Sequence, residues 1–186
     1  MIFLYLNNFH INFVAAIVMM QRFLCGISAL LLLAGCRGSA PEGPDVQPGD
    51  PLPSFLLEMA DGSSLTNAEL KGMPSLILFF HTSCSDCQRT IPVVQQAYEQ
   101  FGETLRFVAV SRGQSKDEVS SWWHHNGITI PYSAQKDRKV YELFALSRIP
   151  RIYVSGSDGI VQACFHDNPC PDYETLSAAL ARVTAQ

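Results

Sequence analysis

Two cysteines, Cys84 and Cys87, are separated by two residues and follow the apolar run Leu76–Phe80, and a stretch with helical periodicity begins with them. We therefore expect both thiols at the N-terminus of a helix that succeeds a strand, where unpaired backbone N–H groups and the helix dipole favour a thiolate. A thiolate attacks disulfides, and a second thiol at this spacing can close back on the first and resolve a mixed disulfide. The pair predicts a redox centre in which Cys84 is the attacking thiolate and Cys87 the resolving thiol.

Three residues beside this pair are candidates for tuning its chemistry. The carboxylate of Asp86 stands between the cysteines and opposes thiolate formation, which predicts a reducing rather than a strongly oxidising couple. His81 precedes Cys84 by three residues and could modulate the thiolate, although a histidine in such a place more often simply ends a strand. Ser85 completes the intervening dipeptide and is the third candidate.

Two interpretations of Cys84 and Cys87 without redox chemistry stay open: an inert disulfide, or half of a metal site. A structural zinc site takes about four ligands, and His81 is the one further candidate close in sequence. We therefore expect no metal at this pair.

A second pair, Cys164 and Cys170, encloses a short loop that contains His166 and Pro169. In an oxidising compartment a structural disulfide between the two is the favoured interpretation. A loop this short would add at most about 2–3 kcal/mol to the stability. A second redox relay, a Cys–His metal site and two free thiols remain the alternatives.

The first 35 residues have the pattern of a secretory signal. Phe23–Leu33 is a short apolar run preceded by Arg22, and a charged start, an apolar segment of about 7–15 residues and a small-residue cleavage site define such signals. Met19 and Met20 stand just before this pattern. We expect the true start near residues 19–20 and removal of the signal after residue 35.

The end of this signal, Leu33-Ala34-Gly35-Cys36, resembles the lipobox of bacterial lipoproteins, in which the cysteine becomes N-terminal and lipidated. The resemblance implies a lipid anchor on Cys36. The alternative is an uncleaved membrane anchor from about Phe13 to Ala34, although Gln21 and Arg22 interrupt that run and a spanning helix needs about 20 mostly apolar residues.

The composition fits one globular domain behind a tether. The 186 residues include 13 basic and 17 acidic ones, with no basic stripe interleaved with aromatics, so no nucleic-acid partner is expected. Residues 36–51 are rich in Gly, Pro and acidic residues, which predicts a flexible linker. The folded domain is expected to span residues 52–186.

Within that domain, strand and helix patterns alternate. Continuous apolar runs predict strands buried on both faces, and apolar residues three and four apart predict amphipathic helices. The expected strands are residues 55–58, 64–65, 76–81, 105–110, 128–132, 152–154 and 160–163; the expected helices begin at the Cys84 pair and at residues 116, 137 and 176, and end near residues 101, 125, 145 and 183. This order predicts an α/β sandwich around one mixed sheet.

The chain resembles thioredoxin-fold proteins. The matching features are the apolar strand, Cys84-x-x-Cys87, Pro92 inside the following helix and Ile149-Pro150 before a hairpin. The resemblance implies that Pro150 is cis, packs against the redox cysteines and shapes the groove for a substrate segment. The N-terminal hairpin and the strand–helix insertion between Ile128 and Ala145 resemble the TlpA/ResA-like branch. A thioredoxin-like sandwich over residues 52–186, with a central mixed sheet flanked by helices, is the implied fold.

The same resemblance implies a membrane-tethered thiol–disulfide oxidoreductase of the bacterial cell envelope, with its domain in the periplasm or an equivalent extracytoplasmic space. It would reduce disulfides of exported proteins or apocytochromes, take electrons from a membrane thiol donor, contact the lipid membrane through Cys36 and need no organic cofactor. The surface departs from the family, since Ser83 replaces the usual Trp before the first cysteine and Arg151 follows Pro150 where many relatives have Thr. Arg148 and Arg151 are expected at the rim of the site.

Three other functions remain open. A peroxiredoxin-like peroxidase would carry Pro-x-x-x-Thr-x-x-Cys, but Ile77 and His81 stand in the places of its Pro and Thr. A copper- or zinc-binding envelope module would use Cys84, Cys87 and a histidine. A non-catalytic thioredoxin-like binding domain would keep the scaffold and lack insulin-reducing activity.

Overall fold

The computed structural model of the protein describes residues 45–185. The expected signal peptide (residues 1–35), the lipidation site Cys36 and the first part of the expected linker therefore lie outside the described residues. Among residues 45–185, no helix is both long enough and apolar enough to cross a membrane.

A five-stranded mixed sheet forms the centre of the fold, with the strand order β5-β4-β3-β6-β7. Its strands are β3 (Ser75–Phe80), β4 (Arg106–Ser111), β5 (Tyr132–Ser133), β6 (Arg151–Ser155) and β7 (Val161–His166). The first three run parallel, whereas β6 pairs antiparallel with both β3 and β7. All six residues of β3 are buried, as expected of an apolar strand covered on both faces. The α/β class and the mixed sheet expected from the sequence are confirmed.

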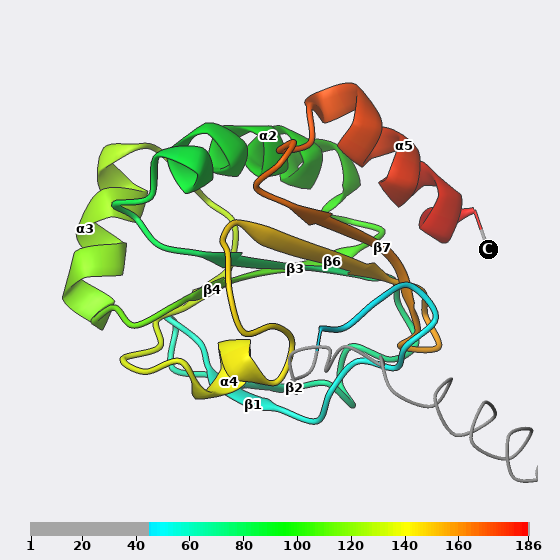
Figure 1. The fold of residues 1–186 in the computed structure, drawn as a ribbon, viewed down its shortest axis with the longest axis horizontal. Helices are drawn as coiled ribbons and strands as arrows, with labels where there is room; N and C mark the ends of the chain where they lie inside the picture. Colours follow the sequence, from blue (N-terminus) through cyan, green and yellow to red (C-terminus); the bar gives the residue numbers. More distant parts are fainter. Residues whose placement is uncertain (1–44, 186) are drawn as a thin grey trace, which may run out of the picture. The chain divides into compact units, whose positions relative to one another are not determined.

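Helices and a small hairpin cover the two faces of this sheet (Figure 1). In that view α2 (Ser85–Phe101) and α5 (Tyr173–Thr184) lie above the sheet, while the short helix α4 (Lys139–Glu142) and the two-stranded sheet of β1 (Leu56–Glu58) and β2 (Ser64–Thr66) lie below it. The buried side of α2 includes Ile91, Val94 and Ala97, which is the apolar stripe that its periodicity predicts.

The helix α3 (Lys116–His125) has the bounds expected from its sequence. It begins at a capping box, in which the Ser115 side chain accepts from the Glu118 backbone N–H and the Glu118 carboxylate accepts from the Ser115 backbone N–H, so two otherwise unpaired donors are satisfied. Trp123 of α3 packs on Phe80 of β3, with ring centroids 4.8 Å apart. This contact fixes α3 to the strand that leads into the cysteine pair.

The insertion between β4 and β6 has less regular structure than expected. The strand expected at residues 128–132 is instead the two-residue β5, which shares only Tyr132 with it. Pro131, just before β5, has no N–H to donate to a ladder. The helix expected over residues 137–145 is limited to α4, four residues long. Beyond α4 the chain continues in turns, with the Phe144 backbone N–H bonded to the Tyr141 carbonyl at 2.9 Å.

Aromatic packing nevertheless fixes this insertion to the sheet. Phe144 packs against both β3 and β6, with its ring centroid 4.9 Å from that of Phe79 and 5.1 Å from that of Tyr153. Tyr141 of α4 meets Phe79 edge-on at 5.5 Å. All four side chains are buried, so α4 is held against the central strand.

The folded part begins earlier than residue 52. Val46 is 6% exposed, its N–H donates to the Phe144 carbonyl at 2.9 Å, and the Gly49 N–H donates to the Val161 carbonyl at 2.8 Å. Asp45 forms an ion pair with Arg151. The Gly-, Pro- and acid-rich composition hid these contacts, because their partners are about a hundred residues away in sequence. Residues 45–51 are therefore part of the domain and not of a linker.

Candidate active site

The two cysteines differ in exposure because of their places on α2. Cys84 is the N-cap residue of this helix and is half-buried, and its Sγ accepts from the Cys87 backbone N–H at 3.5 Å. Cys87 lies in the first turn and is fully buried. A backbone donor and the N-terminus of the helix are therefore both directed at Cys84 Sγ. The geometry thus provides one accessible sulfur and one sheltered sulfur.

The loop that contains Pro150 meets the accessible sulfur. The Ile149–Pro150 peptide bond is cis, as the resemblance implied, and the Ile149 carbonyl oxygen lies 3.7 Å from Cys84 Sγ. The structure therefore brings together Cys84, Cys87 and Pro150 at one end of β3 and β6.

Burial raises the pKa of the Cys87 thiol, chiefly through desolvation of its charged form, while the backbone N–H of His81 and the charge of Arg112 oppose that rise. Cys87 is therefore a protonated thiol at neutral pH. That state suits a resolving thiol, which must not compete with Cys84 for the first attack.

His81 is linked to the pair mainly by its backbone. Its carbonyl accepts from the Cys84 N–H at 3.1 Å, whereas its ring Nδ1 accepts from the Ser83 N–H at 3.2 Å and lies 2.9 Å from Ser83 Oγ. The imidazole therefore orders the Ser83 turn, and a direct action of the ring on the thiolate stays a prediction.

Asp86 has a partner that was not expected. Its carboxylate forms an ion pair with Arg89, one turn along α2, and both side chains are partly exposed. The expected reducing bias from Asp86 stays a prediction. Ser85 is exposed in the first turn of the same helix.

The second cysteine pair lies outside this centre. Cys164 Sγ is 3.5 Å from the Val46 carbonyl oxygen, and Cys170 Sγ is 3.6 Å from that of Asp167. Burial raises the pKa of Cys164 to about 12. All four cysteines of residues 45–185 are free thiols in the structure, so the Cys164–Cys170 disulfide stays a prediction. No group of three or more His, Cys, Asp or Glu side chains in the described part of the chain could hold a metal ion.

One of the two arginines expected at the rim of the site beside Pro150 is buried instead. Arg148 is at the rim as expected, 3.7 Å from the Asp167 carboxylate. Arg151 is not: it is 8% exposed, with Nη1 2.9 Å from the Asp45 carboxylate and Nη2 3.2 Å from the Ser147 carbonyl oxygen. It joins the N-terminal segment to the loop before Pro150, and a partner so distant in sequence left no local signal.

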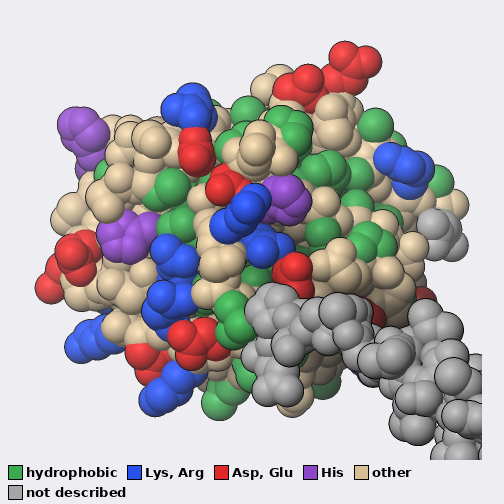
Figure 2. All heavy atoms as spheres, in the orientation of Figure 1, with side chains coloured by type: hydrophobic (Ala, Val, Ile, Leu, Met, Phe, Trp, Pro, Cys, Tyr) green, Lys and Arg blue, Asp and Glu red, His purple; other side chains and the backbone are tan. Residues whose placement is uncertain are grey.

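Charged side chains near α4 pair locally. Arg138 Nε lies 3.2 Å from the Glu142 carboxylate, and Lys139 Nζ lies 3.1 Å from that of Asp137. Figure 2 shows basic, acidic and apolar side chains interspersed over the face in view. Exposed pairs of this kind contribute little to stability, so their main effect is a surface of mixed charge.

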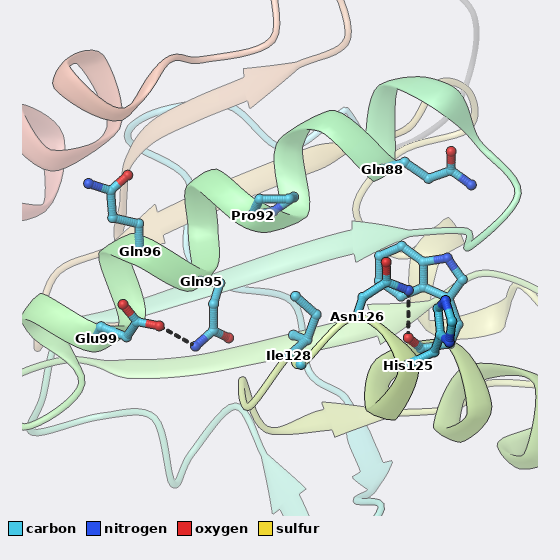
Figure 3. Close-up of a pocket in the computed structure, with 10 residues that line it drawn as sticks. Gln88, Pro92, Gln95, Gln96, Glu99, His125, Asn126 and Ile128 are labelled. Carbon is cyan, nitrogen blue, oxygen red and sulfur yellow. Dashed lines mark hydrogen bonds between the residues drawn. The ribbon is translucent and has the colours of Figure 1, made fainter.

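A groove of about 470 Å³ with a mixed polar and apolar lining lies between α2 and the end of α3. Figure 3 shows Gln88, Pro92, Gln95 and Glu99 of α2 on one side and His125 and Asn126 on the other. Gln88 also bonds the Thr82 carbonyl before Cys84. Neither redox sulfur lines this groove, so it is adjacent to the redox centre and not part of it.

The difference in burial predicts selective alkylation. Brief exposure of the reduced native protein to iodoacetamide at pH 8 should modify Cys84 and spare Cys87 and Cys164, since burial keeps those two as neutral thiols. Peptide mass mapping gives the modified positions, and guanidinium-unfolded protein is the control in which every thiol reacts. Early modification of Cys87 in the folded protein would contradict this geometry.

The mixed sheet, the Cys-x-x-Cys pair at the start of α2 and the cis-proline loop against Cys84 define a thioredoxin-fold protein. The fold is similar to a crystal structure of a thioredoxin-family thiol:disulfide interchange protein from Chlorobium tepidum (TM-score 0.64, 22% identity, 75% of this chain and 99% of that one). It is also similar to a secreted disulfide oxidoreductase of Mycobacterium tuberculosis (TM-score 0.63, 16% identity, 69% of this chain and 95% of that one).

Residues 48–164 match the AhpC/TSA family, and the chain belongs to this family. Among curated proteins it is similar to the thiol-disulfide oxidoreductase ResA of Bacillus subtilis, with 27% identity over 136 residues that cover 70% of this chain and 76% of ResA. The resemblance to the ResA-like branch and the thiol–disulfide oxidoreductase class are thereby confirmed.

Proposed function

We propose that the protein is a membrane-tethered thiol–disulfide oxidoreductase of the bacterial cell envelope that reduces disulfides of exported proteins. The observation that carries this proposal is the asymmetry of the pair: Cys84 is reachable and faces a helix N-terminus, whereas Cys87 is fully buried behind it. Such a pair suits a two-step exchange, in which one sulfur attacks and the other completes the reaction.

In the first step the Cys84 thiolate attacks one sulfur of a substrate disulfide. The substrate S–S bond breaks, a Cys84–substrate disulfide forms, and the released substrate thiolate takes a proton. In the second step the Cys87 thiol loses its proton and attacks Cys84 Sγ, which forms the Cys84–Cys87 disulfide and releases the second substrate thiol. Two electrons pass from the pair to the substrate, and a membrane thiol donor returns them.

The substrate and location rest on the chain's N-terminus and its relatives. Leu33-Ala34-Gly35-Cys36 fits lipidation at Cys36, which would hold the domain at the outer side of a membrane, within reach of exported proteins or apocytochromes. The Mycobacterium tuberculosis structure similar to this chain is of a secreted disulfide oxidoreductase, and that setting agrees with an extracytoplasmic domain.

The test of activity is reduction of insulin disulfides by the full chain with dithiothreitol as donor, run beside a peroxide-consumption assay. We expect insulin reduction well above the dithiothreitol background and peroxide consumption at background. Peroxide turnover without insulin reduction would replace the proposal with a peroxidase, and the absence of both activities would favour a binding domain.

The anchor has its own test. Intact-mass spectrometry of protein extracted from membranes should give a mature chain that begins at an acylated Cys36, since several acyl chains on one residue anchor stably where one does not. A chain that retains Phe23–Leu33 would contradict this anchor.

For Cys164 and Cys170, we propose a disulfide independent of the redox pair in oxidised protein. Peptide mapping without reduction should recover the two residues in one linked peptide. Recovery of Cys164 linked to Cys84 or Cys87 would indicate a relay instead.

A further inference from the structure

A buried tyrosine of α4 holds the backbone next to the redox centre. Tyr141 is 1% exposed, and its hydroxyl donates to the Arg148 carbonyl oxygen at 2.6 Å. Arg148 directly precedes the Ile149–Pro150 peptide, whose Ile149 carbonyl oxygen is 3.7 Å from Cys84 Sγ. The oxygen held by Tyr141 and the oxygen that contacts the reactive sulfur therefore belong to neighbouring peptide units.

The residue held in this way has an unfavourable backbone conformation. Arg148 has φ of +71° and is the one residue other than glycine with positive φ among residues 45–185. A left-handed conformation brings Cβ too close to the following carbonyl, so an arginine adopts it only where the surroundings impose it. The short bond from Tyr141 to the Arg148 carbonyl holds the backbone at this residue.

The tyrosine ring is itself fixed by charge and packing. The guanidinium carbons of Arg112 and Arg138 lie 5.0 Å and 5.5 Å from its centroid, within the range of cation–π attraction. Phe79 meets the same ring edge-on at 5.5 Å. The hydroxyl therefore has a set direction, toward the loop before Pro150.

We propose that Tyr141 is a positioning residue for the redox reaction, whose hydroxyl fixes the Arg148 carbonyl and through it the Ile149 carbonyl that faces Cys84. This inference rests on the proposed role of Cys84 as the attacking thiol. In this role α4, which belongs to the insertion between β4 and β6, sets the geometry of the loop against which both the sulfur and the substrate segment lie.

Tyr141→Phe tests the proposal because it removes one oxygen atom and keeps the ring. Without the bond the Ile149 carbonyl can move away from Cys84 Sγ, which releases the sulfur from an acceptor that favours its protonated form. Alkylation of Cys84 by iodoacetamide at pH 7 should then become about two- to fivefold faster, whereas kcat/KM for insulin reduction should fall about fivefold, the factor that one ordinary hydrogen bond carries.

Tyr153→Phe is the matched control. Tyr153 is equally buried in the same aromatic cluster, and its hydroxyl also donates to a backbone carbonyl, that of Phe144 at 3.3 Å, which is away from the redox loop. We expect a similar decrease in melting temperature for both variants, with the two rate changes confined to Tyr141→Phe. Equal rates in both variants, or a parallel loss of alkylation and activity in Tyr141→Phe, would overturn the proposal.

A double-mutant cycle with Arg148 tests the coupling independently of the insulin assay. Arg148→Gly removes the cost of the left-handed conformation, so the loop needs the hydroxyl less. If both side chains act on the same backbone, adding Tyr141→Phe to Arg148→Gly should change the alkylation rate less than in the wild-type background. Additive effects would refute the coupling. If the wild-type chain failed to reduce insulin, only the proposed function would be contradicted. The alkylation rates would still test the role of Tyr141, because alkylation of Cys84 does not require oxidoreductase activity.

Discussion

Cys84→Ser should lower the rate of insulin disulfide reduction by about three orders of magnitude or more, down to the background of the dithiothreitol donor. The half-buried Cys84 is the one accessible sulfur of the pair, and it is the N-cap of α2 with a backbone N–H directed at Sγ. Serine keeps the size and the cap but supplies a hydroxyl that does not attack disulfides at neutral pH. The fully buried Cys87 cannot replace it, since burial raises its pKa.

Cys164→Ser is the control for that experiment. Cys164 is also half-buried and lies on β7 of the same domain, yet its Sγ contacts the Val46 carbonyl and not the Pro150 loop. We expect it to retain activity. The redox centre would have been assigned to the wrong thiol if Cys84→Ser kept most of the wild-type rate of insulin reduction, or if Cys164→Ser abolished that rate.

The sequence was enough to predict the strand β3, the helix α2 and the place of the cysteine pair between them. Each rests on local patterns: a continuous apolar run, apolar residues three and four apart, and two cysteines at the junction. The cis-proline followed from the resemblance. The local patterns place Cys84 beside Cys87, whereas the contact of the Pro150 loop with Cys84 is distant in sequence and was expected from the resemblance alone.

Three features of the site were not predicted, and the reasons differ. Arg151 is buried because Asp45, over a hundred residues earlier, pairs with it. Tyr141 matters through its bond to Arg148, whose positive φ has no signature in an arginine. The pair between Asp86 and Arg89 was also missed, although sequence could have indicated it from their spacing on a helix.

Cys87→Ser should trap the Cys84–substrate disulfide as a stable covalent complex. In the wild type Cys87 attacks Cys84 Sγ and releases the substrate, and that step needs the Cys87 thiolate. Because burial raises the Cys87 pKa, the thiolate fraction at neutral pH is small and grows about tenfold per pH unit. The lifetime of the wild-type mixed disulfide should therefore shorten as pH rises, whereas the lifetime of the Cys87→Ser complex should not follow this dependence.

The measurement is quenched electrophoresis without reductant, followed by mass mapping of the linked peptide. We expect a band that contains the Cys87→Ser chain and a substrate chain joined through Cys84, and dithiothreitol should cleave it. The double variant Cys84→Ser/Cys87→Ser should give no such band. The buried serine hydroxyl should lower the stability by about 1–3 kcal/mol if it lacks a partner, so a melting curve confirms that the trapped chain is folded. A complex joined through Cys164, or a Cys87→Ser chain that turns over substrate at the wild-type rate, would show that Cys87 does not resolve the intermediate.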